Sequence, residues 1–227
     1  MLSSDPPIRP AATIILLRQD TAQPQVLMGQ RGASAAFMPN KFVFPGGRVD
    51  EADAHIRLSP DLPTRELSRL SAHANDTSPR ALAAGAIREL WEETGLRLGT
   101  SGGPVPQNWP GFAEKNLCPD ASTLRFIFRA VTPPGRPRRF DARFFLAPAT
   151  AIHGDLTDFS AADDELSHLS WLSIEETRDL DLPFITRIVL SELAARLDAP
   201  ETDRPVPFFD QSQPQSRFLQ IGAPAGA

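Results

Sequence analysis

The sequence predicts a single α/β (α+β) domain, and three observations support this. Apolar residues make up 41% and charged residues 22% of the 227 residues, as in ordinary globular proteins. Runs of β-branched and aliphatic residues alternate with helical patterns. Many of the 23 prolines lie between these runs, where they interrupt regular structure. We therefore expect one domain over residues 11–198, with an extension at 1–10 and a tail at 199–227.

The first elements predicted are three strands. Ala11–Leu17 is a run of buried-strand residues, and Val26–Arg31 returns after a polar turn. Phe42–Phe44 is a short apolar strand. It ends at Pro45-Gly46-Gly47, a breaker cluster in which glycine allows the backbone to approach a ligand closely.

A helix is predicted over Arg80–Thr94. Ser78 and Pro79 are suited to the N-cap and the first helical position, and Gly95 is suited to the residue after the last turn. Its core stripe consists of Ala83, Ile87 and Leu90.

The second half of the chain predicts a hairpin, another strand and two helices. Residues 99–121 are rich in Gly, Pro, Asn and Ser, so we expect mainly a loop there. The hairpin strands are Ser122–Thr132 and Arg138–Leu146, the next strand is Glu165–Leu172, and the helices are Ser173–Arg178 and Phe184–Leu197.

Charge and cysteine content narrow the class of protein. A net charge of -5 argues against a general nucleic-acid or membrane binder. Cys118 is the single cysteine, which excludes an internal disulfide and fits a reducing cytoplasm. No run approaches 18 apolar residues, and no secretory signal precedes the first strand. We expect a cytoplasmic protein that acts on a small molecule; the sequence leaves a homodimer open.

The predicted helix carries an acidic cluster. Glu89, Glu92 and Glu93 project within one helical face, where like charges repel unless a cation lies among them. Carboxylate oxygens are hard ligands that suit Mg²⁺ or Mn²⁺. The alternative is a solvated acidic face.

This cluster and the glycine loop before it resemble the Nudix box of Nudix hydrolases, G-x5-E-x7-R-E-U-x-E-E-x-G-U, in which U is apolar. In the loop half, Gly47 matches and Asp53 stands where the family has Glu. Between Asp53 and the next fixed position lie 34 residues instead of seven, so the box is split. The helical half matches at every fixed position: Arg88, Glu89, Leu90, Glu92, Glu93, Gly95 and Leu96.

The resemblance implies the Nudix fold, a mixed sheet sandwiched between helices, and metal-dependent hydrolysis of a diphosphate linked to another moiety. It makes Glu89, Glu92 and Glu93 the expected ligands of Mg²⁺ or Mn²⁺, with a backbone carbonyl in Gly46-Gly47 as a further ligand. Arg88 is then expected to point away from the metal and to pair with Asp53.

The general base varies within the family. Glu89 or Glu93 is one source, and the run Asp163-Asp164-Glu165 is another. We favour Glu165 within that run because it opens a predicted strand; the alternative is a solvated loop cap. Asp158 is a weaker candidate. His153 and His168 are lone histidines, which we expect at surface or satisfied positions.

The stretch before the box resembles an element of coenzyme A diphosphatases, L-L-T-x-R-S-x3-R-x3-G-x3-F-P-G-G. Arg31 and Phe44–Gly47 match, whereas Ala36 and Asn40 replace its second Arg and its Gly. The animal peroxisomal branch also splits its box, has F-M-P before F-P-G-G, and has an R-R-F-D-x-x-F-F-L segment, here Arg138–Leu146.

This likeness implies coenzyme A or acyl-CoA as substrate, cut to 3′,5′-ADP and (acyl-)4′-phosphopantetheine. The implied substrate-binding residues are Arg31, Phe44, Gly46, Arg138 and Arg139, and Arg143 is a further candidate for the 3′-phosphate. ADP-ribose or another nucleoside diphosphate derivative is the alternative substrate. The alternative of another class is a Nudix-fold ligand-binding module without catalysis.

Residues 54–77 are the segment inserted in the box. Pro63–Ala74 predicts a helix with Leu67 and Leu70 on one side. Because both ends of the insertion adjoin the predicted metal site in sequence, we expect it to form a substrate-side cap.

Overall fold

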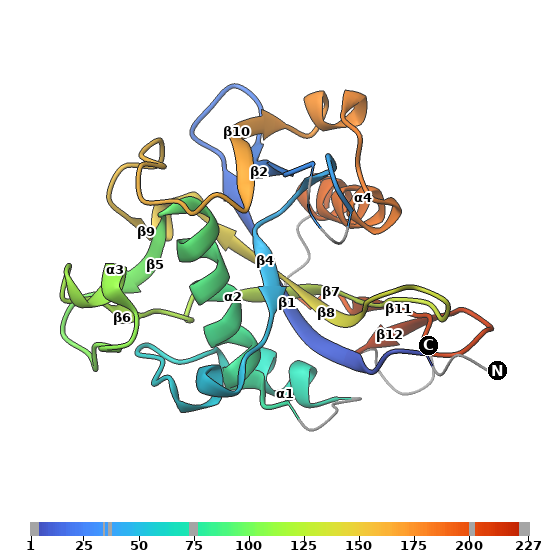
Figure 1. The fold of residues 1–227 in the computed structure, drawn as a ribbon, viewed down its shortest axis with the longest axis horizontal. Helices are drawn as coiled ribbons and strands as arrows, with labels where there is room; N and C mark the ends of the chain where they lie inside the picture. The colour runs from blue at the N-terminus through green and yellow to red at the C-terminus, as the bar shows by residue number, and fades with distance from the viewer. Residues whose placement is uncertain (1–4, 34, 36–37, 73–76, 200–202, 223–227) are drawn as a thin grey trace.

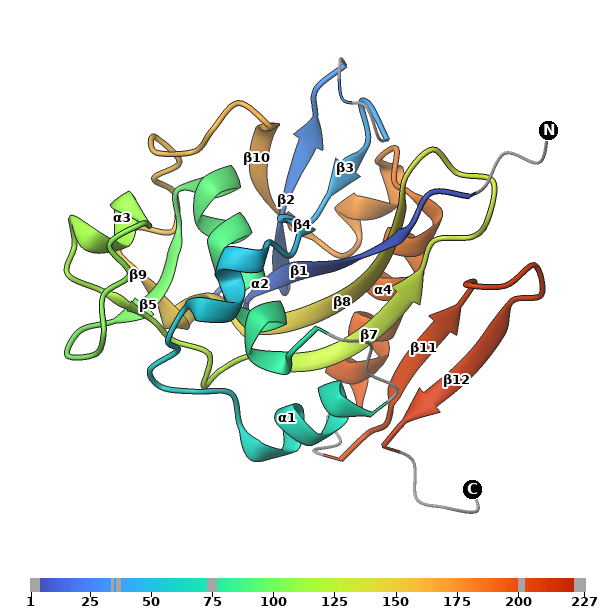
Figure 2. The same ribbon diagram turned by 60° about the horizontal axis from the view of Figure 1, so that its bottom comes forward.

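The computed structural model describes residues 5–33, 35, 38–72, 77–199 and 203–222. Over these ranges the main feature is a mixed sheet of nine strands with helices on both faces (Figure 1; Figure 2). Its path is β10 (Leu166–Ser173), β2 (Gln25–Arg31), β1 (Ile8–Arg18), β8 (Arg139–Pro148), β7 (Arg125–Val131), β11 (Val206–Asp210) and β12 (Arg217–Ile221), with β3 (Phe42–Val43) on β2 and β4 (Gly46–Arg48) on β1.

A small second sheet and short helices complete the described part of the chain. The small sheet has the order β6 (Cys118–Pro119), β5 (Arg97–Thr100) and β9 (Ile152–His153). The helices are α1 (Thr64–Ser71), α2 (Pro79–Thr94), α3 (Pro110–Ala113) and α4 (Phe184–Asp198), with 3-10 turns η1 (Glu51–His55), η2 (Ala149–Ala151) and η3 (Glu176–Asp179). Within the described ranges, no helix combines the length and the apolar content needed to cross a bilayer.

Alternating side chains of β1 divide the core into two layers. Ile14 and Leu16 lie in the cluster that contains the α2 residues, whereas Ile15 and Leu17 pack with the α4 residues on the other face. The sheet is therefore buried on both sides, with α2 and α4 on opposite faces (Figure 1). The expected mixed sheet sandwiched between helices is confirmed.

The partners of β1 change along its length, and this positions the glycine loop. Leu17 pairs with Val26 of β2, but Thr13 pairs with Gly46 of β4. We call this change of partner the fork of the sheet. Beyond it β2 no longer pairs with β1 and pairs instead with β3, with Gly29 opposite Val43. The fork inserts Gly46-Gly47 beside the centre of the sheet, on the edge of β1 that faces away from β8.

Helix α2 begins and ends as its sequence predicts. The Ser78 side chain accepts a hydrogen bond from the N–H of Ala81 at 3.1 Å, and Pro79 occupies the first turn. Gly95 has φ 76°, and its N–H donates to the carbonyl of Trp91 at 2.7 Å. These two caps fix the register of the acidic cluster relative to the helix ends.

Residues 99–121 are more ordered than the predicted loop. They contribute β6 and α3, and Phe112 and Leu117 are fully buried. Phe112 packs edge-on against Trp91 and Trp109, with ring centroids 6.3 and 5.2 Å away. The elements are too short to show a periodic pattern, so composition alone indicated a loop.

The two terminal segments add to the sheet. Within the extension 1–10, β1 already begins at Ile8, opposite Arg139 of β8; residues 1–4 lie outside the described part. The tail 199–227 contributes the hairpin β11–β12, and Phe208 and Phe209 of β11 pair in parallel with Arg129 and Ala130 of β7. Residues 200–202 and 223–227 are not described.

The described part of the insertion packs into the core, and its expected role as a substrate-side cap stays a prediction. Leu62 and Leu70 are 4% and 2% exposed, within the cluster that joins the sheet to α2. Helix α1 lies beside the N-terminal half of α2 and the sheet (Figure 2). One end of the insertion meets η1, but the other leads into Pro79, about 15 Å along the helix axis from Glu89. Residues 73–76 are not described.

Polar contacts also fasten α1 to distant segments. Glu66 is 1% exposed, and its carboxylate accepts the N–H of Phe126 at 3.0 Å, where β7 has an irregular register. Arg69, 7% exposed, donates to the Asp203 carboxylate at 3.1 Å, just before β11. The insertion thus holds together the sheet and the C-terminal hairpin.

We predict that Glu66→Ala lowers the free energy of unfolding by about 2–3 kcal/mol, because it leaves the buried N–H of Phe126 without its charged acceptor. Urea unfolding followed by circular dichroism measures this change. The matched control is Ser68→Ala on the exposed side of the same helix, which should change stability by less than about 0.5 kcal/mol. A Glu66→Ala effect as small as that of the control would refute the fastening role.

Candidate functional site

The glycine loop touches the acidic face of α2 through its backbone. The N–H of Gly46 donates to Glu93 Oε2 at 2.7 Å. A Cβ atom at Gly47 would lie 2.5 Å from Glu89 Oε2, and one at Gly46 would lie 2.6 Å from the Ala12 carbonyl oxygen. Gly46 has no room for a side chain because the neighbouring atoms belong to the backbone of β1, whereas a Cβ at Gly47 would displace the Glu89 carboxylate.

Arg88 joins the two halves of the split motif. Its Nε donates to Asp53 Oδ1 at 2.9 Å and its Nη2 to Asp53 Oδ2 at 3.0 Å, a bidentate pair. Nη2 also donates to the carbonyl of Arg48 at 2.9 Å. The side chains of Arg88 and Asp53 are 11% and 1% exposed. The shorter Asp53 therefore reaches Arg88 despite the insertion between them.

The other edge of Arg88 faces the acidic cluster. Its Nη1 donates to Glu89 Oε1 at 2.8 Å and to Glu92 Oε2 at 2.7 Å. Arg88 thus contacts two of the acids expected to bind the metal, and its expected orientation away from the metal stays a prediction. Arg88 is the local counter-charge for both glutamates in this structure.

Two details hold Asp53 in place. The N–H of Asp50 donates to Asp53 Oδ2 at 2.8 Å within a capping box at the start of η1. On α2, a Cβ atom at Gly85 would lie 2.9 Å from the same oxygen, so the absence of a side chain there lets η1 approach the helix. Short-range chemistry thus fixes the loop half of the motif against the helical half.

Burial perturbs the carboxyl groups of the cluster. Burial raises the pKa of Glu89 to about 7; Arg88 opposes this shift and the charge of Glu165 adds to it. Burial also raises the pKa of Glu93 well above its usual value. The charge of Glu89 raises it further, and the hydrogen bond from the N–H of Gly46 opposes the shift. At Glu89 and Glu93, burial therefore outweighs the nearby groups that favour the ionised carboxylate.

Arg31 and Glu165 form an ion pair beside this cluster. Arg31 ends β2 and Leu166, its cross-strand neighbour, begins β10. Arg31 Nη2 donates to Glu165 Oε1 at 2.7 Å. The charges of both residues act on the pKa of Glu93, which places them at the same site.

A divalent cation fits the chemistry of this donor set. Glu89, Glu92 and Glu93 supply hard oxygens, and the raised pKa values of Glu89 and Glu93 show acids that a cation would stabilise. Within the described residues, no three Asp, Glu, His or Cys side chains are arranged as a metal-holding group. Glu89 and Glu92 are instead turned to Arg88, and Glu93 to the N–H of Gly46.

Several predicted substrate contacts are not brought to the site. Arg139 is 7% exposed and donates to the carbonyls of Thr132 and Ser212 at 3.2 and 2.9 Å. Arg143 is 1% exposed and paired with Asp141 at 2.8 Å. Both are buried structural cations here, and expecting them to bind a ligand was wrong.

Phe44 and Arg138 are also placed away from the carboxylates. Phe44 is 3% exposed in the core layer on the α4 side, so its ring is not available to a ligand. Arg138 is exposed in the turn before β8. The first residue of β8 lies opposite Ile8 of β1, whereas Gly47 lies opposite Ala12, so Arg138 is several residues along the sheet from the glycine loop. Ala36 lies outside the described residues, as does Phe37 of the F-M-P segment.

The other candidate side chains have local partners. Asp158 accepts from the Ser160 N–H at 3.0 Å within a surface turn, and the Asp163 N–H donates to the carbonyl of Glu92 at 2.8 Å. His153 pairs with Arg97 between β9 and β5, and His168 lies at the irregular stretch of β10; both are exposed.

Sequence reasoning missed two contributors to the site. The carbonyl of Arg48 accepts from Arg88, but backbone acceptors leave no mark in a sequence. Asn40 has φ 60° and donates its N–H to the Arg31 carbonyl at 3.0 Å. Asn tolerates this conformation better than most residues, so its place in a glycine-aligned position was a signal available from the sequence.

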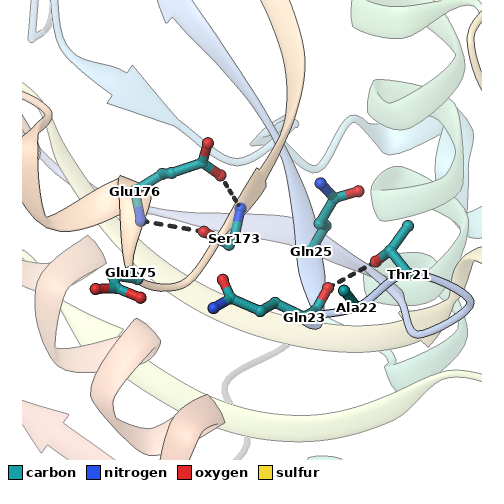
Figure 3. Close-up of a pocket in the computed structure, with 7 residues that line it drawn as sticks. All are labelled: Thr21, Ala22, Gln23, Gln25, Ser173, Glu175 and Glu176. Carbon is teal, nitrogen blue, oxygen red and sulfur yellow. Dashed lines mark hydrogen bonds between the residues drawn. The ribbon is translucent and has the colours of Figure 1, made fainter.

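A surface hollow of about 400 Å³ lies elsewhere on the molecule. It is formed by the β1–β2 turn and the start of η3, around Gln23, Ser173 and Glu176 (Figure 3). The Ser173 N–H donates to Glu176 Oε2 at 2.7 Å and the Glu176 N–H donates to Ser173 Oγ at 3.2 Å, a capping box. These polar groups satisfy one another, and none of them belongs to the acidic cluster.

Comparisons with known proteins agree with the fold and the motif. No profile of a known protein family matches the chain. It is 29% identical over 185 residues to nudix hydrolase 7 of Caenorhabditis elegans, covering 75% of this chain and 53% of that protein. It is 29% identical over 179 residues to an acyl-coenzyme A diphosphatase of Gallus gallus, covering 54% of this chain and 47% of that protein. The matched part thus spans about half the length of these curated relatives.

A solved structure shows the same likeness. The crystal structure of a NUDIX hydrolase from Alicyclobacillus acidocaldarius superposes with a TM-score of 0.59 at 26% identity. The superposition covers 83% of this chain and 92% of that one.

We predict that the metal-free protein loses stability as pH rises towards 7. Burial raises the pKa of folded Glu89 to about 7, whereas the ordinary pKa of a glutamate is 4.5. Between these two pH values the folded state therefore binds more protons than the unfolded state. The free energy of unfolding in chelator should therefore fall as pH rises through this window. Urea unfolding of the wild type and Glu89→Gln between about pH 5 and pH 8 tests it. The variant should show a flatter profile; equal slopes would contradict the assignment.

Proposed function

We propose that this chain, which has the Nudix fold and resembles Nudix hydrolases, is a metal-dependent hydrolase. Its substrate is a diphosphate that links a nucleoside to another moiety. The observation that carries the proposal is the reassembled box: Arg88 binds Asp53 across the insertion, and Glu89 and Glu93 lie against the backbone of Gly46-Gly47. A ligand-binding module without catalysis would have no need of these buried, mutually repelling acids.

The proposed chemistry assigns separate tasks to the residues of the site. Glu89, Glu92 and Glu93 would hold Mg²⁺ or Mn²⁺, with a backbone carbonyl of Gly46 or Gly47 as a further donor. The cation supplies charge neutralisation at the diphosphate and acidifies water. Arg88 restricts the rotamers of Glu89 and Glu92, and its own pKa is raised: burial alone would lower it, but the Asp53 hydrogen bonds and the nearby acids outweigh burial.

The proton acceptor for the attacking water is Glu165 or Glu89 in this proposal. Glu165 is half-exposed at the mouth of the cluster, and its backbone N–H is held by Asp163 at 2.9 Å. Glu89 is the alternative because it belongs to the cluster; its pKa of about 7 describes the cation-free site, and a bound cation would lower it. Changing each residue to its amide and following the pH dependence of kcat separates the two.

We further propose coenzyme A or acyl-CoA as the substrate, cleaved to 3′,5′-ADP and (acyl-)4′-phosphopantetheine. The support is the element from Arg31 to Gly47 and the likeness to a relative named as an acyl-coenzyme A diphosphatase. Asn40 strengthens this support, because φ 60° is a conformation that the glycine of the element readily adopts. Burial of Arg139 and Arg143 weakens it, since neither can reach a 3′-phosphate in this structure.

Metal dependence is the first prediction of this proposal. Hydrolysis of the preferred diphosphate should vanish in excess EDTA and return with Mg²⁺ or Mn²⁺. Glu92→Gln and Glu93→Gln should each lower kcat by about a hundredfold or more, since each removes a charged ligand oxygen. The control Glu114→Gln, exposed beyond α3, should keep the wild-type rate. Full activity after exhaustive chelation would overturn the proposal.

The substrate prediction is tested with a panel of CoA, dephospho-CoA, ADP-ribose and NADH, with products identified by mass. CoA should exceed dephospho-CoA in kcat/KM by about tenfold, the value of one charge-assisted contact to the 3′-phosphate. Equal rates on the two, or a preference for ADP-ribose, would transfer the assignment to the alternative substrate class.

A further inference from the structure

The backbone of Arg31 is held by the loop that follows it. The N–H of Arg31 donates to the Lys41 carbonyl at 2.9 Å, and its carbonyl accepts the N–H of Asn40 at 3.0 Å. Met38 and Asn40 in the returning loop both have positive φ, at 53° and 60°. A conformation that costs energy for these residues persists only where the surrounding contacts fix it. The strand end that carries Arg31 is therefore fixed, and the guanidinium contacts Glu165 from this fixed base.

The two halves of its ion pair are unequally exposed. The Arg31 side chain is 17% exposed, whereas that of Glu165 is 50% exposed. Within the described residues, Arg31 Nε is buried without a hydrogen-bond partner, so one edge of the guanidinium is only half used. An acceptor with several oxygens, such as a phosphate, satisfies both Nε and Nη2, which the single Glu165 oxygen does not.

The backbone of Glu165 is anchored on both sides, whereas its carboxylate has a single described contact, with Arg31. Asp163 is tied to the last turn of α2 through Glu92, and Leu166 pairs with Arg31 across the strands. The side chain between these two anchors contacts Arg31 and is half-exposed to solvent. The carboxylate can leave Arg31 by rotating its own side chain, without any movement of the backbone.

We propose that the Arg31–Glu165 ion pair is a resting contact that a phosphate of the substrate replaces, so that Glu165 sets how tightly the site holds an anion. This inference rests on the proposed function for the identity of the anion. Glu165 competes with substrate for Arg31 and, once displaced, stands free beside the cluster. The diphosphate thereby exchanges one negative partner of Arg31 for another, and the displaced carboxylate of half-exposed Glu165 is solvated by water.

Binding of α,β-methylene-ADP, whose bridging carbon resists hydrolysis, tests this exchange by calorimetry in Mg²⁺ buffer. Glu165→Gln should tighten binding about three- to tenfold, because it removes a partly exposed competitor. Arg31→Gln should weaken binding at least about tenfold, because it removes a charge-assisted contact. Adding Glu165→Gln to Arg31→Gln should give no further gain. The matched control is Asp164→Asn, an exposed neighbour that loses the same charge and should leave the affinity unchanged.

The outcomes separate this inference from the proposed function. Unchanged or weaker binding in Glu165→Gln overturns it, as does an equal gain in Asp164→Asn, which would indicate only long-range repulsion. A gain that persists in the double variant also overturns it, because Arg31 would not be the contested group. These readouts need no turnover, so a protein that fails to hydrolyse the panel can still show the exchange. In an active enzyme, Glu165→Gln should lower KM whether or not it also lowers kcat.

Discussion

The buried guanidinium of Arg88 is the interaction on which the rest of the site depends. One edge holds Asp53 and the Arg48 carbonyl, and the other holds Glu89 and Glu92. A buried cation is tolerated only when its donors are satisfied, and here the acceptors come from both sides of a long insertion. The insertion changes the path of the chain, but it leaves the contacts between the two halves of the motif intact.

The fork in the sheet supplies the second constraint. Because β1 exchanges β2 for β4, two glycines lie between a central strand and the helix that carries the acids. The backbone there meets Glu93 and Glu89 directly, and the same burial that creates this contact raises the pKa values of both acids. Burial of acids is therefore built into the architecture, and a divalent cation in the proposed reaction would stabilise their ionised forms. The insertion contributes to stability from the opposite end of α2, through Glu66 and Arg69.

Local chemistry was enough to predict the elements that carry the site. Ser78 and Gly95 act on neighbouring backbone groups, so the ends of α2 and the spacing of its acids followed from the sequence. The misplaced residues depend on contacts between distant segments. Glu66 meets Phe126 across 60 residues, and this contact joins the insertion to the core. Arg139 and Phe44 were expected at the substrate site but are buried for a related reason. The register of β8 and the change of partner strands along β1 decide which side chains face inwards.

The central claim is that the split motif forms one unit through Arg88 and Asp53. A double-mutant cycle with Arg88→Met and Asp53→Asn, measured by urea unfolding in chelator, tests it most directly. The account predicts that each single change is strongly destabilising, and that the pair is less costly than the sum of the two by about 2–3 kcal/mol. Additive effects, within about 0.5 kcal/mol, would show that the two residues act independently and would contradict the account.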